Sequence, residues 1–172
     1  QRLTIEVTRR ARNLRHSRHV AGALFGLFRV ETRALIQHRA ARVLAIGADR
    51  RVYDAFMLPE TWVYDITVVL AEAAVKTGRI SLGTCILGVW NRSAATIAMA
   101  ARTLASMSSG RFVLGLGAST PQLAEGLHDV PFVAPIGRMR RTVNQVRALL
   151  RGDRVPLAVA TGARALKLNV PP

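Results

Sequence analysis

The sequence predicts an α/β fold with parallel strands, built from about four strand–helix units. Short runs rich in β-branched and aromatic residues alternate with longer stretches whose apolar residues recur at helical spacing. Two Gly-Arg pairs, Gly78-Arg79 and Gly110-Arg111, lie 32 residues apart, about the length of one such unit. Strands that alternate with helices pair in parallel through right-handed crossovers. The sequence therefore indicates a parallel sheet covered by helices.

The individual elements follow from local composition. Strands are expected where apolar and β-branched residues cluster between turn signals, at residues 24–30, 52–58, 80–86 and 112–116. Helices are expected where helical periodicity is sustained, at residues 32–46, 65–76, 93–107 and 137–150. Ser93 is a candidate N-cap. Glycines at or just beyond the helix ends indicate C-caps, namely Gly47, Gly78, Gly110 and Gly152.

Composition limits the class of protein. With 172 residues, of which 50% are hydrophobic and 20% charged, the chain suits one globular domain. No apolar run approaches the ~18 residues of a spanning helix, so no membrane association is expected. Cys85 is the single cysteine, which excludes an internal disulfide and favours a reducing, cytoplasmic location. His16, His19 and His38 have no Cys, Asp or Glu ligand set nearby, so no metal site is predicted.

The net charge of +15 is concentrated at the start of the chain, where residues 1–51 contain 12 arginines and 3 acidic residues. This excess raises the hypothesis of a non-enzymatic nucleic-acid-binding protein, whose affinity would fall steeply with salt. No RNP, zinc-finger or helix-turn-helix signature is present, and few aromatic residues are available for stacking. A nucleic-acid partner is therefore not expected. Arg138, Arg140 and Arg141 are interpreted as a solvated helix face, with binding of phosphate or an acidic partner as the alternative.

A glycine-rich segment, GLGAST at residues 115–120, follows the last expected strand. It departs from a dinucleotide-binding fingerprint because Thr120 replaces the third glycine and Pro121 follows at once. No acidic residue stands about 20 positions further on to bind a ribose. A Rossmann fold is therefore disfavoured, while an open doubly wound sheet and half of an eight-stranded barrel both stay open.

Residues 56–172 resemble the luciferase-like monooxygenase family, in particular its branch that uses the deazaflavin coenzyme F420. The resemblance is carried by FMLPE at 56–60, YDITVVLAEAAVKTGRISLGTCILGVWNRS at 64–93 and SSGRFVLGLGASTPQLAEGLHDVPFVAPIGRMRRTVNQVRALLRGDRV at 108–155. The family fold is a (β/α)8 TIM barrel of roughly twice this length. The resemblance thus implies a partial barrel, with its N-terminal half in residues 51–172, preceded by an Arg-rich segment, residues 1–50, that holds a first strand–helix unit. A truncated chain is the expectation, and its activity is left open.

The resemblance also implies a site at the carboxyl ends of the strands, where barrel enzymes carry their functional groups. Cys85-Ile86 matches the place of a non-prolyl cis peptide that forms a bulge supporting the coenzyme ring. The alternative is that Cys85 is a small buried strand residue. The residues expected to bind the coenzyme are Glu60, Thr84, Cys85, Ile86, Gly117, Ala118, Ser119 and Thr120, and those expected to line a substrate pocket are Trp90 and Asn91.

Several of these assignments have a structural alternative. The small residues Gly117, Ala118 and Ser119 let backbone amides approach a ligand closely, but they also suit a tight strand-to-helix connection. Glu60 is either a coenzyme contact or a solvated loop carboxylate. Thr120 stands near the turn where some sugar-phosphate dehydrogenases of the family carry a catalytic Glu, so no catalytic residue is assigned.

The function implied by the resemblance is F420-dependent oxidoreduction, in which hydride passes between the deazaflavin and a small organic substrate while the protein orients both. An FMN-dependent monooxygenase is the alternative within the family. A homodimer is a further expectation, because an incomplete barrel leaves open strand edges.

Overall fold

The computed structural model describes residues 42, 44–50, 53–60, 64–156 and 165–170. These residues divide into two units. One, here named the sheet unit, holds the described residues up to 87 together with 104–115. The other, the helical unit, holds residues 88–103 and the described residues from 116 onward. Each unit is described by itself.

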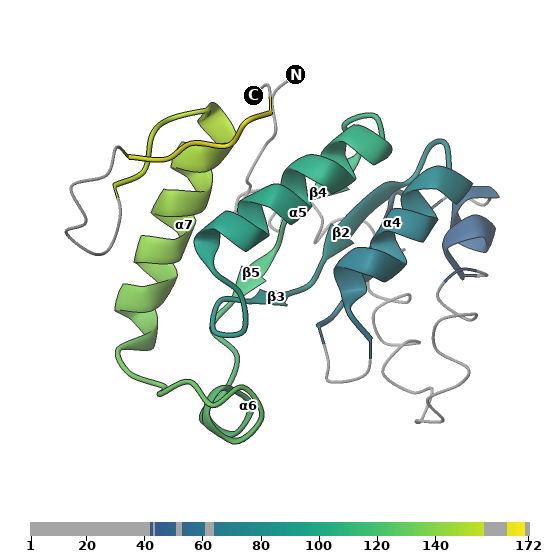
Figure 1. The fold of residues 1–172 in the computed structure, drawn as a ribbon. Coiled ribbons are helices and arrows are strands. Elements are labelled where there is room, and N and C mark those ends of the chain that lie inside the picture. Colours follow the sequence, from purple (N-terminus) through teal and green to yellow (C-terminus); the bar gives the residue numbers. More distant parts are fainter. Residues whose placement is uncertain (1–41, 43, 51–52, 61–63, 157–164, 171–172) are drawn as a thin grey trace. The chain divides into compact units, whose positions relative to one another are not determined.

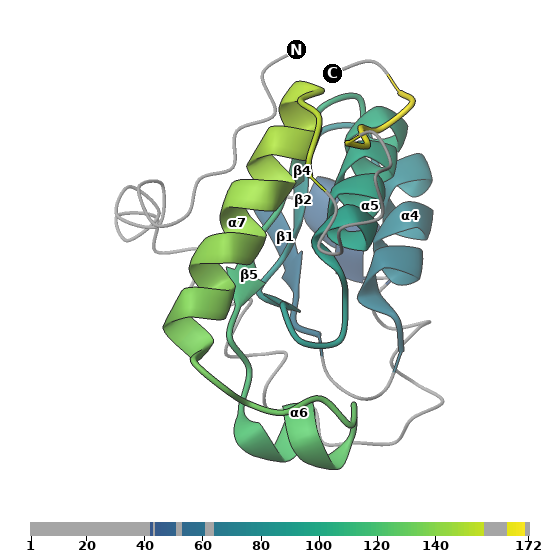
Figure 2. The ribbon, with the colours of Figure 1, turned by 60° about the vertical axis from the view of Figure 1, so that its left-hand side comes forward.

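The sheet unit contains three parallel strands in the order β1-β2-β4. They are β1 (Ala55–Leu58), β2 (Ser81–Thr84) and β4 (Phe112–Val113), and Figure 2 shows them side by side. Leu58 is paired with Thr84, and Leu82 with Phe112. The side chains of Phe56, Leu58 and Leu82 are buried. The parallel pairing predicted from the alternation of strands and helices is confirmed.

Helix α4 (Ile66–Lys76) packs against β2. The Asp65 carboxylate caps it by accepting the Thr67 N–H at 2.9 Å, which satisfies one of the donors left free at a helix start. Its inward face buries apolar residues, namely Ile66, Val69, Leu70, Ala73 and Ala74. The helix ends at Thr77 in extended backbone, with φ −123° and ψ 150°. Gly78 is therefore not the left-handed C-cap that the sequence suggests.

The chain before β1 is helical at residues 44–50, so the expected helix end at Gly47 is wrong. The helix continues far enough for the Asp49 carboxylate to accept the backbone N–H groups of Gly78, Arg79 and Ile80, at 3.1, 2.8 and 2.7 Å. The expected first strand, at residues 24–30, lies outside the described residues.

Two of the expected strands are interrupted. The run predicted at 80–86 forms β2 and then β3 (Leu87–Gly88), and the run predicted at 112–116 forms β4 and then β5 (Leu116–Gly117). At the interruption the Thr84 hydroxyl donates to the Gly115 carbonyl at 2.8 Å and accepts the Gly115 N–H at 2.9 Å. These two bonds replace the sheet ladder locally, and β3 and β5 then pair in a separate two-stranded sheet.

Three helices contribute to the helical unit, and Figure 1 labels them α5 (Ala94–Met107), α6 (Pro121–Gly126) and α7 (Pro135–Arg151). Residues 94–103 of α5 belong to this unit. Ser93 caps α5 as predicted, since its Oγ accepts the Thr96 N–H at 3.1 Å. Helix α7 ends at Gly152, whose φ of 83° confirms the predicted C-cap. A core cluster of Val89, Trp90 and Ala124, with Met139 packed against it, connects α6 to α7.

Helix α6 was not expected, and α7 begins two residues earlier than predicted. Both begin with a proline in the first turn, Pro121 and Pro135. Proline suits that position because its missing N–H would have no partner there. In the sequence, Pro121 counts as a departure from the dinucleotide-binding fingerprint, and its second meaning as a helix start is not used. Among the described helices, none is long and apolar enough to cross a membrane.

Candidate functional site

The residues expected to form a site fall into two groups, one in each unit. The sheet unit holds Glu60, Thr84, Cys85 and Ile86. The helical unit holds Trp90 and Asn91 together with residues 117–120.

The first group lies at the carboxyl ends of β1 and β2, as expected for a barrel. The Cys85 N–H donates to the Leu58 carbonyl at 2.7 Å, and the Glu60 N–H donates to the Ile86 carbonyl at 3.0 Å. These two bonds continue the pairing of β1 with β2 past the ends of both strands. The structure thus brings Glu60 next to Cys85 and Ile86.

Thr84 fixes the start of this group through its bonds to Gly115. Its side chain is 0% exposed, and its hydroxyl uses both its donor and an acceptor site on Gly115. Gly115 has no room for a side chain, because a Cβ there would collide with the Thr84 carbonyl oxygen. The Leu87 N–H donates to the same Gly115 carbonyl at 2.8 Å. Thr84 therefore holds the turn in place with a buried side chain, and a coenzyme-binding role for it stays a prediction.

The peptide bond between Cys85 and Ile86 is cis, the conformation that the family resemblance implies at this position. Cys85 is exposed, so the alternative that it is a buried strand residue is wrong. Ile86 and Glu60 are half-buried. The chain therefore passes from the fully buried Thr84, at the end of β2, to the exposed Cys85 and the half-buried Ile86.

The second group is organised around Trp90, whose side chain is buried. Its indole N–H donates to the Ala118 carbonyl at 2.5 Å, which brings Trp90 together with residues 117–120. The Phe132 ring lies with its centroid 4.8 Å away at a tilt of 32°. The Arg138 guanidinium lies 4.5 Å from the centre of the indole, within the range of a cation–π contact.

Arg138 is held in a second way, because its Nε–H donates to the Val89 carbonyl at 3.0 Å. It is half-buried, whereas Arg140 and Arg141 are exposed. The interpretation of all three arginines as a solvated face is therefore wrong for Arg138. Its position in sequence gave no sign of this role, since Trp90 lies 48 residues away.

The remaining residues of the second group connect β5 to α6. The Gly117 carbonyl accepts the Val89 N–H at 3.1 Å. Ser119 has left-handed backbone, with φ 59°, and exposed Thr120 is the N-cap of α6. The strand-to-helix connection is thus observed, and a ligand-binding role for these residues stays a prediction. The Asn91 Oδ1 atom is buried and has no hydrogen-bond partner among the described residues.

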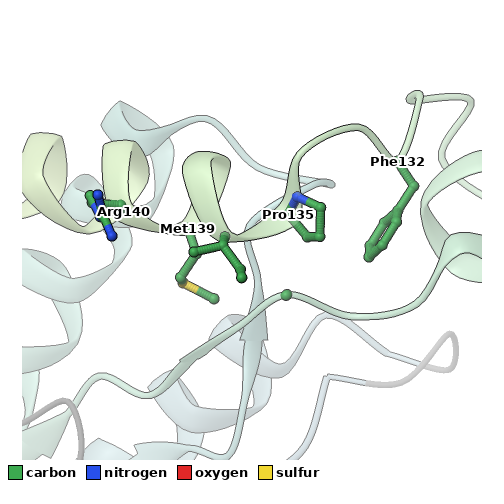
Figure 3. A pocket seen from close by; sticks show the side chains of 6 residues that line it. Phe132, Pro135, Met139 and Arg140 are labelled. Carbon is green, nitrogen blue, oxygen red and sulfur yellow. The ribbon is translucent and has the colours of Figure 1, made fainter.

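Next to Trp90 the helical unit contains an open pocket of about 460 Å³ (Figure 3). Apolar atoms make up almost all of its lining, which comes from Ala118, Phe132, Pro135, Ile136, Met139 and Arg140. Except for Ala118, these residues were not predicted to belong to a site. The start of α7 at Pro135 was the signal that could have pointed to them, because it places Ile136, Met139 and Arg140 on consecutive turns.

Within the described residues, no three His, Cys, Asp or Glu side chains are grouped so that they could hold a metal ion. His16, His19 and His38 lie outside those residues.

Comparison with known proteins identifies the family of this chain. Residues 22–162 match the sequence profile of the luciferase-like monooxygenases. The chain belongs to this family. A Mycobacterium tuberculosis protein, assigned by its name provisionally to the coenzyme F420-dependent oxidoreductases, is 36% identical over 104 residues. That alignment covers 60% of this chain and 30% of the relative. The chain therefore spans about a third of the length of the curated relatives it matches.

Solved structures of the luciferase-like family share the fold. The oxygenating constituent of a Pseudomonas putida 3,6-diketocamphane monooxygenase, solved with FMN, matches with a TM-score of 0.66 at 18% identity, over 74% of this chain and 38% of its own. The coenzyme F420-dependent tetrahydromethanopterin reductase of Methanopyrus kandleri matches with a TM-score of 0.58 at 22% identity, over 66% and 37%. The predicted partial (β/α)8 barrel with parallel strands is confirmed.

Proposed function

We propose that this chain carries part of the coenzyme site of an F420-dependent oxidoreductase. The relative from M. tuberculosis supports the choice of coenzyme, since it is 36% identical over 104 residues. The observation that carries the proposal is the meeting of Glu60, Cys85 and Ile86 at the carboxyl ends of two neighbouring parallel strands. Barrel enzymes bind their reactants at that end of the sheet.

The side chains at this end of the sheet fit a flat, largely apolar ring. Ile86 offers an aliphatic surface and Cys85 an exposed, polarizable one. Glu60, whose backbone N–H is bonded to the Ile86 carbonyl, adds an acidic residue beside this surface. When bound, F420 supplies the redox chemistry by accepting or donating hydride at C5 of the deazaflavin, and the protein supplies orientation and electrostatics.

The chain's own contribution is to fix that surface before the coenzyme arrives. The bond from Cys85 N–H to Leu58, the bond from Glu60 N–H to Ile86 and the reciprocal pair between Thr84 and Gly115 hold the loops after three strands. Groups that are already held in place lose less conformational entropy when a ligand binds. Within the helical unit, the buried Trp90 indole is held in the same way, by its bond to the Ala118 carbonyl and by Arg138. A substrate role for Trp90 and Asn91 rests on the family resemblance.

The test is a fluorescence titration of the purified chain with F420 and, separately, with FMN. We expect saturable micromolar binding of F420. Cys85→Trp places a bulky ring on the proposed surface and should weaken F420 binding at least about tenfold by steric exclusion. Val75→Trp, at a position 62% exposed on α4, introduces the same side chain elsewhere in the sheet unit and should leave binding unchanged.

The outcomes separate the two coenzymes. Binding of FMN without F420 would overturn the F420 assignment in favour of a flavin-dependent monooxygenase. Failure of the folded chain to bind either coenzyme would overturn the proposal that this part of the barrel carries the site. Circular dichroism of each variant confirms that it is folded.

A further inference from the structure

The pocket beside Trp90 combines an apolar lining with an arginine at its edge. Figure 3 shows Phe132, Pro135 and Met139 along the loop and the first turns of α7, with Arg140 on the next position of that helix. Its volume of about 460 Å³ lies within the range of about 300–1,000 Å³ that is usual for small-molecule sites. An aromatic ring, a proline ring and a thioether are side chains that pack well on the face of a flat molecule.

The wall of this pocket is held rigidly. Phe132 is fixed on one side by its ring contact with Trp90. Its backbone N–H donates to the Glu125 carboxylate at 2.9 Å. Trp90 is itself fixed by Ala118 and Arg138. The pocket is therefore preformed on the Phe132 side, and it does not depend on a ligand to order that ring.

The helix that lines the pocket carries charge of one sign, whereas Glu125 places a carboxylate against the backbone of Phe132. Residues 131–151 contain five arginines and no acidic residue. Arg140 is exposed, and its guanidinium has no hydrogen bond or ion pair with another residue of the described chain. Arg140 lines the pocket, and because nearly all of that lining is apolar, it contributes its aliphatic stem. A stem packed in this way leaves the charged guanidinium to the solvent. A planar guanidinium binds a carboxylate through two parallel hydrogen bonds.

We infer that this pocket binds a flat, apolar carboxylate of about the size of two fused rings, with the ring system against Phe132 and Met139 and the carboxylate on Arg140. The inference rests on the proposed function and deepens it, because it names the class of substrate. The pocket shares Ala118 with the residues expected to bind the coenzyme, and its other lining residues are separate from them.

The test uses naphthalene-2-carboxylate and its neutral analogue naphthalene-2-methanol, which have the same ring system. Binding to the purified chain is followed by the probes' own fluorescence. We expect the carboxylate to bind at least about tenfold more tightly than the alcohol. Arg140→Gln should remove this preference by weakening only the carboxylate. Arg147→Gln, at an exposed position of the same helix outside the pocket, should change neither affinity.

A second variant addresses the ring site. Ile136 is 76% exposed, so Ile136→Glu should leave folding intact while its charge repels the carboxylate and removes an apolar contact. We expect a loss of at least about tenfold in carboxylate affinity. Equal affinity for the two probes, or carboxylate binding that neither Arg140→Gln nor Ile136→Glu reduces, would overturn the inference. F420 titrated in parallel distinguishes this failure from failure of the coenzyme proposal.

Discussion

The two Gly-Arg turns of the sheet unit look alike in sequence and are stabilised in different ways. At Gly110 the chain satisfies its own backbone, since Gly110 takes left-handed backbone with φ 83° and its N–H returns to the Ala105 carbonyl at 2.7 Å. At Gly78 the chain stays extended, and the backbone donors of the turn go to the Asp49 carboxylate, 29 to 31 residues away.

The two arginines differ as well. The half-buried Arg111 guanidinium donates four hydrogen bonds, to the carbonyls of Ala74, Thr77 and Ile80 and to the Thr77 hydroxyl, at 2.6 to 3.1 Å. Arg79 donates at the surface, to the Asp49 carbonyl at 3.0 Å. The Gly-Arg motif thus occurs at the same place in both strand–helix units, but its arginine makes different contacts in each. Arg111 ties the end of α4 to the start of β2, whereas the other turn is tied by Asp49.

The largest expected effect is that of Arg111→Ala. It leaves three carbonyl groups without their charged donor, and we expect the free energy of unfolding to fall by about 3 kcal/mol. Urea denaturation measures this change. Arg111→Lys keeps the charge but has one terminal nitrogen in place of the two that donate these bonds, so it should recover only part of the lost stability. A loss no larger than that of Arg79→Ala would show that the two turns do not differ as described.

Asp49→Ala comes next, because it removes the acceptor of three backbone N–H groups while water can still reach part of the turn. We expect a loss of about 2 kcal/mol in the same assay. Asp49→Asn retains one acceptor oxygen and should lose less. If Asp49→Ala proved neutral, the carboxylate would not be what holds the Gly78 turn.

The three hydrogen bonds from Gly78, Arg79 and Ile80 to the Asp49 carboxylate, here called the Asp49 clamp, also predict that the fold loses stability in acid. The backbone N–H of Ile80, followed by those of Gly78 and Arg79 and by the Arg79 charge, lowers the pKa of Asp49 below its ordinary value of 3.8 against an opposing effect of burial. A lowered pKa stabilises the fold above the unfolded-state value, and this stabilisation disappears as pH falls through the folded-state pKa. The stability difference between the natural chain and Asp49→Asn should therefore be constant above about pH 5 and shrink below it. A difference independent of pH down to acid unfolding would contradict the shift.

The glycines provide a matched pair. Gly110→Ala forces a side chain into left-handed backbone and should destabilise by about 1 kcal/mol. Gly78→Ala meets no atom within 4 Å and no positive φ, so it should be neutral or stabilise by up to about 0.5 kcal/mol. Thermal unfolding of the two variants side by side checks this. Equal effects would mean that the two turns share one backbone conformation in solution.

Arg79→Ala should have the smallest effect, within about 0.5 kcal/mol, because its hydrogen bonds to the carbonyls of residues 48 and 49 lie at the surface. Adding 0.5 M salt should lower the stability of the natural chain slightly more than that of this variant, because salt screens the attraction between Arg79 and Asp49. A loss of unfolding free energy near that of Arg111→Ala would instead show that Arg79 stabilises its turn as strongly as Arg111 does.

Much of this architecture was predictable because local signals and tertiary structure agree. The Ser93 cap, the Gly152 cap and the alternation of strands with helices follow from short-range chemistry. The interrupted strands could not be predicted in this way, since the interruption depends on a bond between Thr84 and Gly115, 31 residues apart. For the same reason the sequence gave no indication that Trp90 bonds to Ala118 or that Arg138 stacks on its ring.

The Asp49 clamp also closes a loop. The chain from Asp49 to Ile80 contains β1 and α4, and three hydrogen bonds join its two ends much as a cross-link would. Joining the ends of a loop this long costs chain entropy, which the bonds and the packing of α4 on β2 must offset together. A chain shortened to begin at residue 51 would keep β1 and α4 but lose this closure. The helix at 44–50 is therefore part of what folds the sheet unit, despite its place in the Arg-rich segment.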